Sequence, residues 1–302
     1  MDMRSRLPIA LAICVLATAC GSDSSPTTTS TTAGGGVTTT IAPTTTTMPP
    51  TTTTVPAELP TATAFFFADT GGNGSRQGPF LIAVAVPIAD DGSPELAALL
   101  QGPPREAADA GITSEIPAGT AVESLDIGSD GVALVELTQT FDDGGGSASM
   151  LGRLAQLTFT LTARDDVDSV LLMENGAVVE VFSNEGIILD GPMQRSDFED
   201  FLPGILVEDP AWGATVSLPF TASGTAAAFE AVFQMQALSG DDIVFEPPFV
   251  TTDNGVGFGA FEIVVDADVP TPGELTLRVW EFSARDGSVV NERFVPLTVV
   301  DS

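Results

Sequence analysis

Cys20 lies between an apolar N-terminal run and a long threonine-rich stretch, and this position limits which part of the sequence can form a folded domain. An apolar run from Leu7 to Leu16 precedes it, with two arginines near the start and the small residues Ala17–Ala19 directly before the cysteine. This pattern is typical of an export signal, residues 1–19, that ends at a lipid-attachment cysteine. The run is shorter than the about 20 residues that a transmembrane helix needs, so we expect cleavage and not a membrane span.

The small residues before Cys20 allow two kinds of processing. An ordinary signal peptidase would accept Ala-Thr-Ala and release an unmodified protein. Lipidation is favoured by the position of Cys20, by Gly21–Asp23 after it and by the spacer that follows. The segment resembles a bacterial lipobox, although Ala17 stands where Leu is usual. We therefore expect Cys20 to be acylated and to hold the protein on the extracytoplasmic face of a bacterial cell membrane, because two acyl chains anchor stably.

No cysteine remains for a disulfide in the expected mature protein. Cys14 lies inside the signal and is removed with it, and Cys20 carries the lipid. An exported protein without disulfides must be stable through burial of apolar surface. A folded part of more than about 100 residues can bury enough surface to do so.

Threonine and proline dominate residues 20–63, and Gly34–Gly36 adds a flexible break. Such a composition cannot form a core, so we expect a disordered, partly polyproline-like tether. At about 3.1 Å per residue, the tether would extend on the order of 100 Å. The folded part is then expected to form two domains, residues 64–201 and 203–302.

The charge of the chain excludes several classes of function. The formal charge is −31, histidine is absent, and every basic residue is an arginine. A field of this sign repels nucleic acid, so we expect no nucleic-acid partner. Without histidine and lysine, a Ser-His-Asp triad, an imidazole zinc site and Schiff-base chemistry are all excluded. We therefore predict no catalytic residue of these classes and no cofactor.

Calcium is the metal that this composition could still bind through oxygen ligands. The candidate ligands are Asp165, Asp166 and Asp168, or Asp241 and Asp242. Neither group follows the spacing of an EF-hand loop, and acidic turn residues in an acidic protein are usually solvated. We therefore predict no metal site.

The pattern of residues 64–201 predicts an α+β domain. Ser93, followed by proline and an apolar stripe, predicts a helix that ends at Gly102. Apolar residues at helical spacing predict a longer helix from about Ser147, and Asn175-Gly176 predicts a hairpin turn. Strands are expected at residues 65–67, 80–88, 122–127, 132–137, 167–173 and 177–182.

Several segments of this region carry a family resemblance. They are Leu99–Pro103, Gly111–Thr120, Leu157–Thr162 and Asn175-Gly176. Together they are similar to the GerMN domain of spore-germination and envelope lipoproteins. The resemblance covers most of residues 63–200, and it implies an α/β module that acts by assembly and has no known catalysis.

Residues 203–302 have a different pattern of apolar and polar residues. Apolar and polar residues alternate over Phe229–Gln236, Phe261–Asp266 and Leu275–Val279, with turns such as Pro272-Gly273 between the runs. Short alternating strands with regular turns predict an all-β sandwich.

Three short segments of this second region, Val207–Pro210, Ser223-Gly224 and Phe229–Ala231, resemble the immunoglobulin-like domain of bacterial spore germination, which commonly follows a GerMN domain. The usual immunoglobulin disulfide is absent, so its core must depend on packing. Trp212 and Trp280 are either exposed anchors for a partner or part of the cover of the sandwich core, and the second interpretation is the simpler one.

These features predict a non-enzymatic, membrane-anchored envelope lipoprotein that acts as a binding or assembly module. The expected partners are the membrane, through the lipid on Cys20, and an envelope protein or cell-wall polymer; self-assembly stays open. The alternative is a cell-wall glycan hydrolase that uses two carboxylates, because that chemistry needs neither histidine nor lysine.

Overall fold

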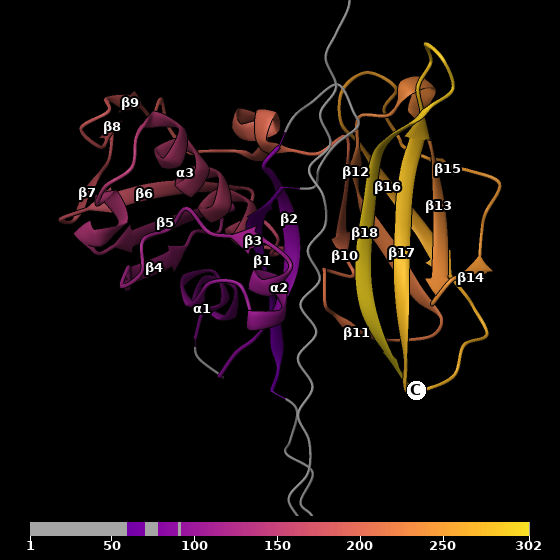
Figure 1. Ribbon diagram of the computed structural model, residues 1–302. Helices are drawn as coiled ribbons and strands as arrows, with labels where there is room; N and C mark the ends of the chain where they lie inside the picture. The colour runs from indigo at the N-terminus through magenta and orange to yellow at the C-terminus, as the bar shows by residue number, and fades with distance from the viewer. Residues whose placement is uncertain (1–58, 70–77, 90–91, 302) are drawn as a thin grey trace, which may run out of the picture. The chain divides into compact units, whose positions relative to one another are not determined.

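The computed structural model describes residues 59–69, 78–89 and 92–301, which belong to one compact unit, Pro56–Ser302 (Figure 1). The expected signal 1–19, Cys20 and nearly all of the expected tether 20–63 lie outside the described residues. No helix in the described ranges is long and apolar enough to cross a membrane. The predicted order is confirmed: a mixed α/β region is followed by an all-strand region.

The first region contains a sheet of three strands in the order β2-β1-β3. Its strands are β1 (Thr61–Ala68), β2 (Phe80–Pro87) and β3 (Ile112–Thr113). Phe65–Phe67 are buried in the central strand, as predicted. The strand begins at Thr61, inside the expected tether, because Thr61–Thr63 pair with Ala85–Pro87 and β-branched threonine suits a strand.

A second sheet has the order β4-β5-β6-β7, and the described part of the region also contains three α-helices. The strands are β4 (Val122–Ile127), β5 (Val132–Leu137), β6 (Ser169–Glu174) and β7 (Ala177–Val178). The helices are α1 (Pro94–Gln101), α2 (Arg105–Asp109) and α3 (Ser147–Leu161). The predicted helices at residues 94–101 and from Ser147 are therefore confirmed, whereas α2 is a short helix that the sequence pattern did not indicate. The chain runs from β5 through α3 to β6, and β5 and β6 are parallel neighbours (Figure 1).

Polar side chains form a stripe on α3, although the helix is buried on nearly every side. The side-chain amide of Gln156 donates to the backbone oxygen of Phe65 over 2.8 Å, and Thr160 Oγ1 accepts from the Phe65 N–H over 3.0 Å. Strand β3 pairs with β1 only at Phe67 and Ala68, so the backbone of Phe65 has no strand partner on that side. The polar residues of α3 thus satisfy a strand edge that would otherwise be buried without hydrogen bonds.

The predicted hairpin at Asn175-Gly176 is confirmed. Both residues have positive φ angles, 51° and 76°, as a tight turn of this kind requires. The predicted strand at residues 177–182 is wrong in extent, since β7 ends at Val178. The chain then forms a separate pair, β8 (Val181–Phe182) with β9 (Ile187–Ile188), which places Phe182 against Phe141 with ring centroids 5.5 Å apart.

The second region is a sandwich of two sheets, ordered β10-β12-β16 and β11-β18-β17-β13-β14, with β15 also paired to β13. The strands of the first sheet are β10 (Ile205–Asp209), β12 (Phe220–Ala226) and β16 (Gly259–Val265). The others are β11 (Thr215–Ser217), β13 (Val232–Ser239), β14 (Asp242–Phe245), β15 (Val250–Thr251), β17 (Gly273–Phe282) and β18 (Val289–Val300). The core between the sheets includes the predicted residues Phe261, Leu275 and Leu277.

One predicted strand of the sandwich begins later than expected. Phe229–Ala231 form a short 3-10 turn, and Glu230 and Ala231 have positive φ angles of 56° and 58°. Phe229 is 61% exposed. The alternating pattern that begins at Phe229 therefore corresponds to a strand only from Val232 onwards, because Phe229–Ala231 form a turn.

Candidate functional site

The two regions of the compact unit contact each other at Trp212, in the loop between β10 and β11. Its N–H donates to the oxygen of Ala83 over 2.9 Å, and its oxygen accepts from the N–H of Ala85 over 3.0 Å. The next residue, Gly213, donates to the oxygen of Pro296 over 2.8 Å. The Trp212 side chain packs against both hydrophobic cores. Strand β2 of the first region and β18 of the second are thus joined through one short loop.

Side-chain contacts extend this junction. Arg195, just before the second region, forms an ion pair with Glu208 over 2.6 Å. The Arg195 guanidinium also lies over the Phe159 ring at 4.9 Å from its centroid. Leu206 and Ala211, from the second region, belong to the first core. Apolar, ionic and cation–π contacts therefore all contribute to the junction.

A partly enclosed cavity of about 470 Å³ lies at this junction, and we call it the junction cavity. Its volume is within the range of about 300–1,000 Å³ that is usual for small-molecule sites. The lining residues come from β1, β2, β3, β10 and β18, the end of α2 and three loops: Ala68, Asp69, Ile82, Ala83, Ala110, Ile112, Pro203, Ile205, Leu206, Val207, Trp212, Glu292, Arg293, Phe294 and Val295.

Arg293 is the basic residue among those that line the junction cavity. Its side chain is 7% exposed, and its guanidinium lies over the Phe80 ring at 5.4 Å from the centroid. Within the described residues, its side chain makes one hydrogen bond, from Nη1 to the backbone oxygen of Glu292 over 2.7 Å. The Nε–H is buried and has no acceptor among the described residues. Burial lowers the pKa of Arg293 to about 10, which still leaves it charged at neutral pH.

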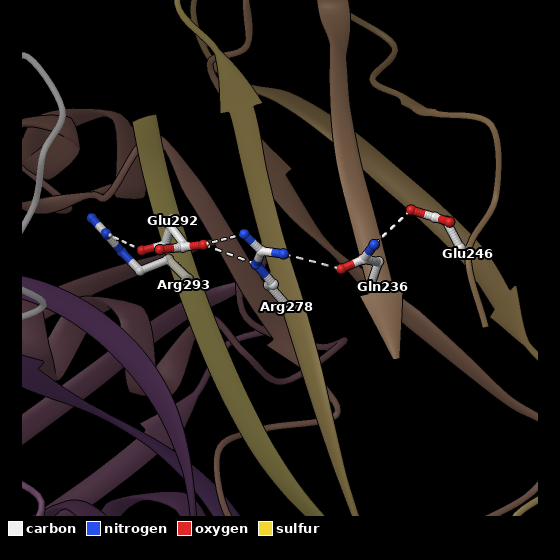
Figure 2. Close-up of polar contacts among 5 residues, drawn as sticks. All are labelled: Gln236, Glu246, Arg278, Glu292 and Arg293. Atoms are coloured by element: carbon white, nitrogen blue, oxygen red, sulfur yellow. Dashed lines mark hydrogen bonds and ion pairs between the residues drawn. The ribbon is translucent and has the colours of Figure 1, made fainter. Parts of the chain in front are cut away.

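A row of polar side chains crosses the large sheet from the junction cavity (Figure 2). Arg278 donates to Glu292 Oε1 from Nε over 2.8 Å and from Nη2 over 2.6 Å. Arg278 Nη1 donates to Gln236 over 3.1 Å, and Gln236 in turn donates to Glu246 over 2.6 Å. The carboxylate of Glu292 is therefore held by Arg278 on β17, on the other side of β18 from the Arg293 guanidinium (Figure 2).

The structure describes all of the candidate calcium ligands, for which no metal site was predicted. Asp166 accepts two hydrogen bonds from Arg164, over 2.9 and 3.0 Å, and these bonds lower the pKa of its carboxyl. Asp242 begins β14, and Asp241 belongs to the turn before it. Within the ranges that the structure describes, no group of three or more His, Cys, Asp or Glu residues could hold a metal ion.

The two tryptophans differ from each other. Trp212 is half-buried and packs on both cores, as the simpler interpretation expected. Trp280 is 6% exposed, but it is not among the residues of the sandwich core. It lies beside Arg278, whose guanidinium is 4.4 Å from the ring centroid, and next to Phe282. The expectation that it covers the core is therefore corrected, because it faces the polar row of the sheet.

A second hollow, of about 490 Å³, lies beside α3 and the β8–β9 hairpin. Leu151 and Ile188 line it and are exposed by 36% and 70%, and Val181, the cross-strand partner of Ile188, is 58% exposed. This group of side chains offers apolar contact surface to solvent.

Sequence reasoning did not identify Arg293. The sequence pattern did indicate that Arg293 is buried. Every second residue after it, Val295, Leu297 and Val299, lies in the sandwich core, and alternate residues of a strand point to the same face. An arginine at such a position is either paired inside the protein or has another role. The predicted lipid-attachment residue, Cys20, lies outside the described residues.

Two family models match this chain. Residues 63–180 match the family described as "Sporulation and spore germination", and residues 204–288 match the "Immunoglobulin-like domain of bacterial spore germination". A comparison with curated proteins gave no match.

Three solved structures are similar to parts of the chain. The first GerMN domain of the sporulation protein GerM from Bacillus subtilis is 22% identical, with a TM-score of 0.38 over 45% of this chain and 98% of that one. The tandem GerMN domains of the same protein are 16% identical, with a TM-score of 0.39 over 80% of this chain and 61% of that one. A proposed lipoprotein from Clostridium perfringens is 17% identical, with a TM-score of 0.31 over 45% of this chain and 89% of that one.

Proposed function

We propose that this chain, which carries a GerMN domain followed by an immunoglobulin-like domain of bacterial spore germination, is a non-enzymatic envelope lipoprotein. Lipid on Cys20 holds it on the extracytoplasmic face of the cell membrane, and the Thr/Pro-rich tether carries the two domains away from the bilayer. The domains act as a binding or assembly module for an envelope protein or a cell-wall polymer.

The observation that supports a binding role is the junction cavity. It is of ligand size, and both domains contribute its lining, so its shape depends on the hydrogen bonds of Trp212 with β2 and of Gly213 with β18. Sites for small molecules are commonly found where domains meet. The exposed apolar side chains around Ile188 add a contact surface of the kind that a protein partner covers.

The geometry of the junction cavity speaks against the glycan-hydrolase alternative. Such an enzyme needs one carboxyl as general acid and a second as nucleophile or base. The acids that line the cavity are Asp69 and Glu292. Glu292 Oε1 accepts two hydrogen bonds from the Arg278 guanidinium, so this oxygen is already engaged inside the protein and is poorly placed to act on a glycan.

Membrane fractionation of cells that express the full chain tests the anchor. Cys20→Ser should move the protein from the membrane fraction to the soluble or unprocessed fraction. Cys14→Ser, inside the expected signal, is the matched control and should leave the distribution unchanged. Equal membrane retention of both variants, with the signal removed from both, would contradict a lipid on Cys20.

Cross-linking and co-purification from detergent-solubilised membranes test the binding role. We expect the wild-type chain to retain an envelope protein or wall fragment. Incubation with purified cell wall should release no glycan, and Asp69→Asn and Glu292→Gln should change nothing in that assay. Glycan release that either substitution abolishes would establish the hydrolase instead.

A further inference from the structure

We propose that the junction cavity binds the carboxylate of a small molecule with an apolar body, and that Arg293 recognises this carboxylate. The inference rests on the proposed binding function and adds the chemistry of the ligand to it. Three features of the cavity carry it: an arginine with an unused donor, the lack of an ion pair between this arginine and any acid that the structure describes, and apolar walls.

The buried arginines of the two domains differ in how well they are satisfied. Arg153, on α3, is 3% exposed, and its guanidinium donates to four backbone oxygens. These are the oxygens of Glu115, Phe141, Asp143 and Gly144, at 2.9, 2.6, 3.0 and 2.8 Å. Arg293 is nearly as buried, yet it makes one hydrogen bond, to the backbone of its own neighbour. Arg153 is therefore a structural residue, whereas Arg293 keeps donor capacity that the described part of the protein does not use.

No described acid neutralises Arg293. The ion pairs among the described residues engage Arg105, Arg164, Arg195 and Arg278, and not Arg293. The adjacent carboxylate, Glu292, is bound to Arg278 (Figure 2). A buried cation without a counterion is unfavourable, and an anionic ligand would relieve this. The low pKa of Arg293, caused by burial, agrees with this geometry.

The remaining walls indicate the body of the ligand. Ile82, Ile112, Trp212 and Phe294 line the cavity of about 470 Å³ and offer aliphatic and aromatic contact. A single guanidinium matches a single negative charge, and its planar N–H groups match the two oxygens of a carboxylate. A phosphate dianion would leave one charge uncompensated in a protein whose formal charge is already −31. These arguments favour a monocarboxylate with an aliphatic or aromatic body.

Ligand-observed fluorine NMR of the full chain tests this inference directly. The probe is para-fluorophenylacetate, with octanoate as an aliphatic competitor. The corresponding neutral amide and phenyl phosphate serve as comparison compounds. Arg293→Met removes the proposed carboxylate contact, and Arg285→Met, at an exposed arginine, is the matched control. Ala110→Trp fills the mouth of the cavity from an exposed position, so it keeps the test informative if the Arg293 variant does not fold.

We expect saturable binding of the acid that octanoate displaces. The amide, phenyl phosphate and the Arg293→Met variant should each bind at least tenfold more weakly, and Ala110→Trp should abolish binding. Arg285→Met should bind as the wild type does. Equal affinities for acid and amide, tighter binding of phenyl phosphate, binding that survives both Arg293→Met and Ala110→Trp, or no binding of either carboxylate would each overturn the inference. A chain that fails the membrane-retention test would contradict the proposed function and leave this binding result unaffected.

Discussion

Replacing Arg293 by Met should make the protein more stable, although it removes a hydrogen bond and a cation–π contact. Burial lowers the pKa of Arg293 to about 10, well below the ordinary value of an arginine. At about 1.4 kcal/mol per pH unit, folding therefore disfavours the charged guanidinium by about 3 kcal/mol. The protein loses this penalty only as the pH rises above about 10, so at pH 7 the penalty acts in full.

The variant also loses two favourable contacts. The hydrogen bond to the Glu292 oxygen contributes about 1 kcal/mol, and the contact with the Phe80 ring contributes about 1 kcal/mol. Methionine keeps most of the apolar stem and fills irregular space well. The net expectation is a gain of about 1 kcal/mol, which raises Tm by roughly 2–4 °C in a unit of this size.

Urea unfolding at pH 7, followed by tryptophan fluorescence and circular dichroism, measures the free energy of unfolding. Arg285→Met is the control and should stay within about 0.5 kcal/mol of the wild type. Saturating para-fluorophenylacetate should stabilise the wild type and leave Arg293→Met unchanged, because only a protein that binds the ligand gains from it. If Arg293→Met lost more than about 2 kcal/mol, Arg293 would be a structural residue, and the reasoning about its unsatisfied donors would be refuted.

Three further predictions concern the first domain. Arg153→Met should lower the free energy of unfolding by about 3–5 kcal/mol, because one buried and three partly buried backbone oxygens lose their donor; a loss under 1 kcal/mol in urea unfolding would contradict this. Gln156→Leu should cost about 2–4 kcal/mol, since the Phe65 oxygen loses its hydrogen bond, and amide hydrogen exchange in β1 should accelerate; unchanged exchange would argue against the polar stripe on α3. Millimolar calcium should raise Tm no more than magnesium at the same concentration does, because Asp166 is paired with Arg164. A clear rise with calcium alone would show a calcium site that this pairing argues against.

The local elements of the fold could be predicted where short-range chemistry decides the structure. Ser93 and Pro94 mark the start of α1, and Asn175-Gly176 adopts the positive φ angles that its turn requires. Other features depend on contacts between distant residues. Alternation in β5 and β6 does not reveal that they pair in parallel, and the alternation at Phe229 does not reveal that the chain first forms a turn.

The candidate site could be predicted only in part. Trp212 stands out in the sequence as one of two tryptophans. That its loop joins β2 to β18 could not be predicted, because the joining hydrogen bonds run to Ala83 and Pro296, which are far away along the chain. Arg293 alternates in step with buried residues of its strand, yet its burial depends on the Phe80 ring, from the other domain, and on the walls of the cavity, to which both domains contribute. The sequence also contains Glu292 beside it, and only the structure shows that Arg278 occupies this carboxylate.

Mass spectrometry of the mature N-terminus, on protein purified from its own membrane, tests the anchored-module account most directly. The account predicts a chain that begins at Cys20, with a mass increase that corresponds to acyl chains on its sulphur and no residue of the segment 1–19. A mature chain that begins elsewhere, or one whose Cys20 is an unmodified thiol, would contradict it.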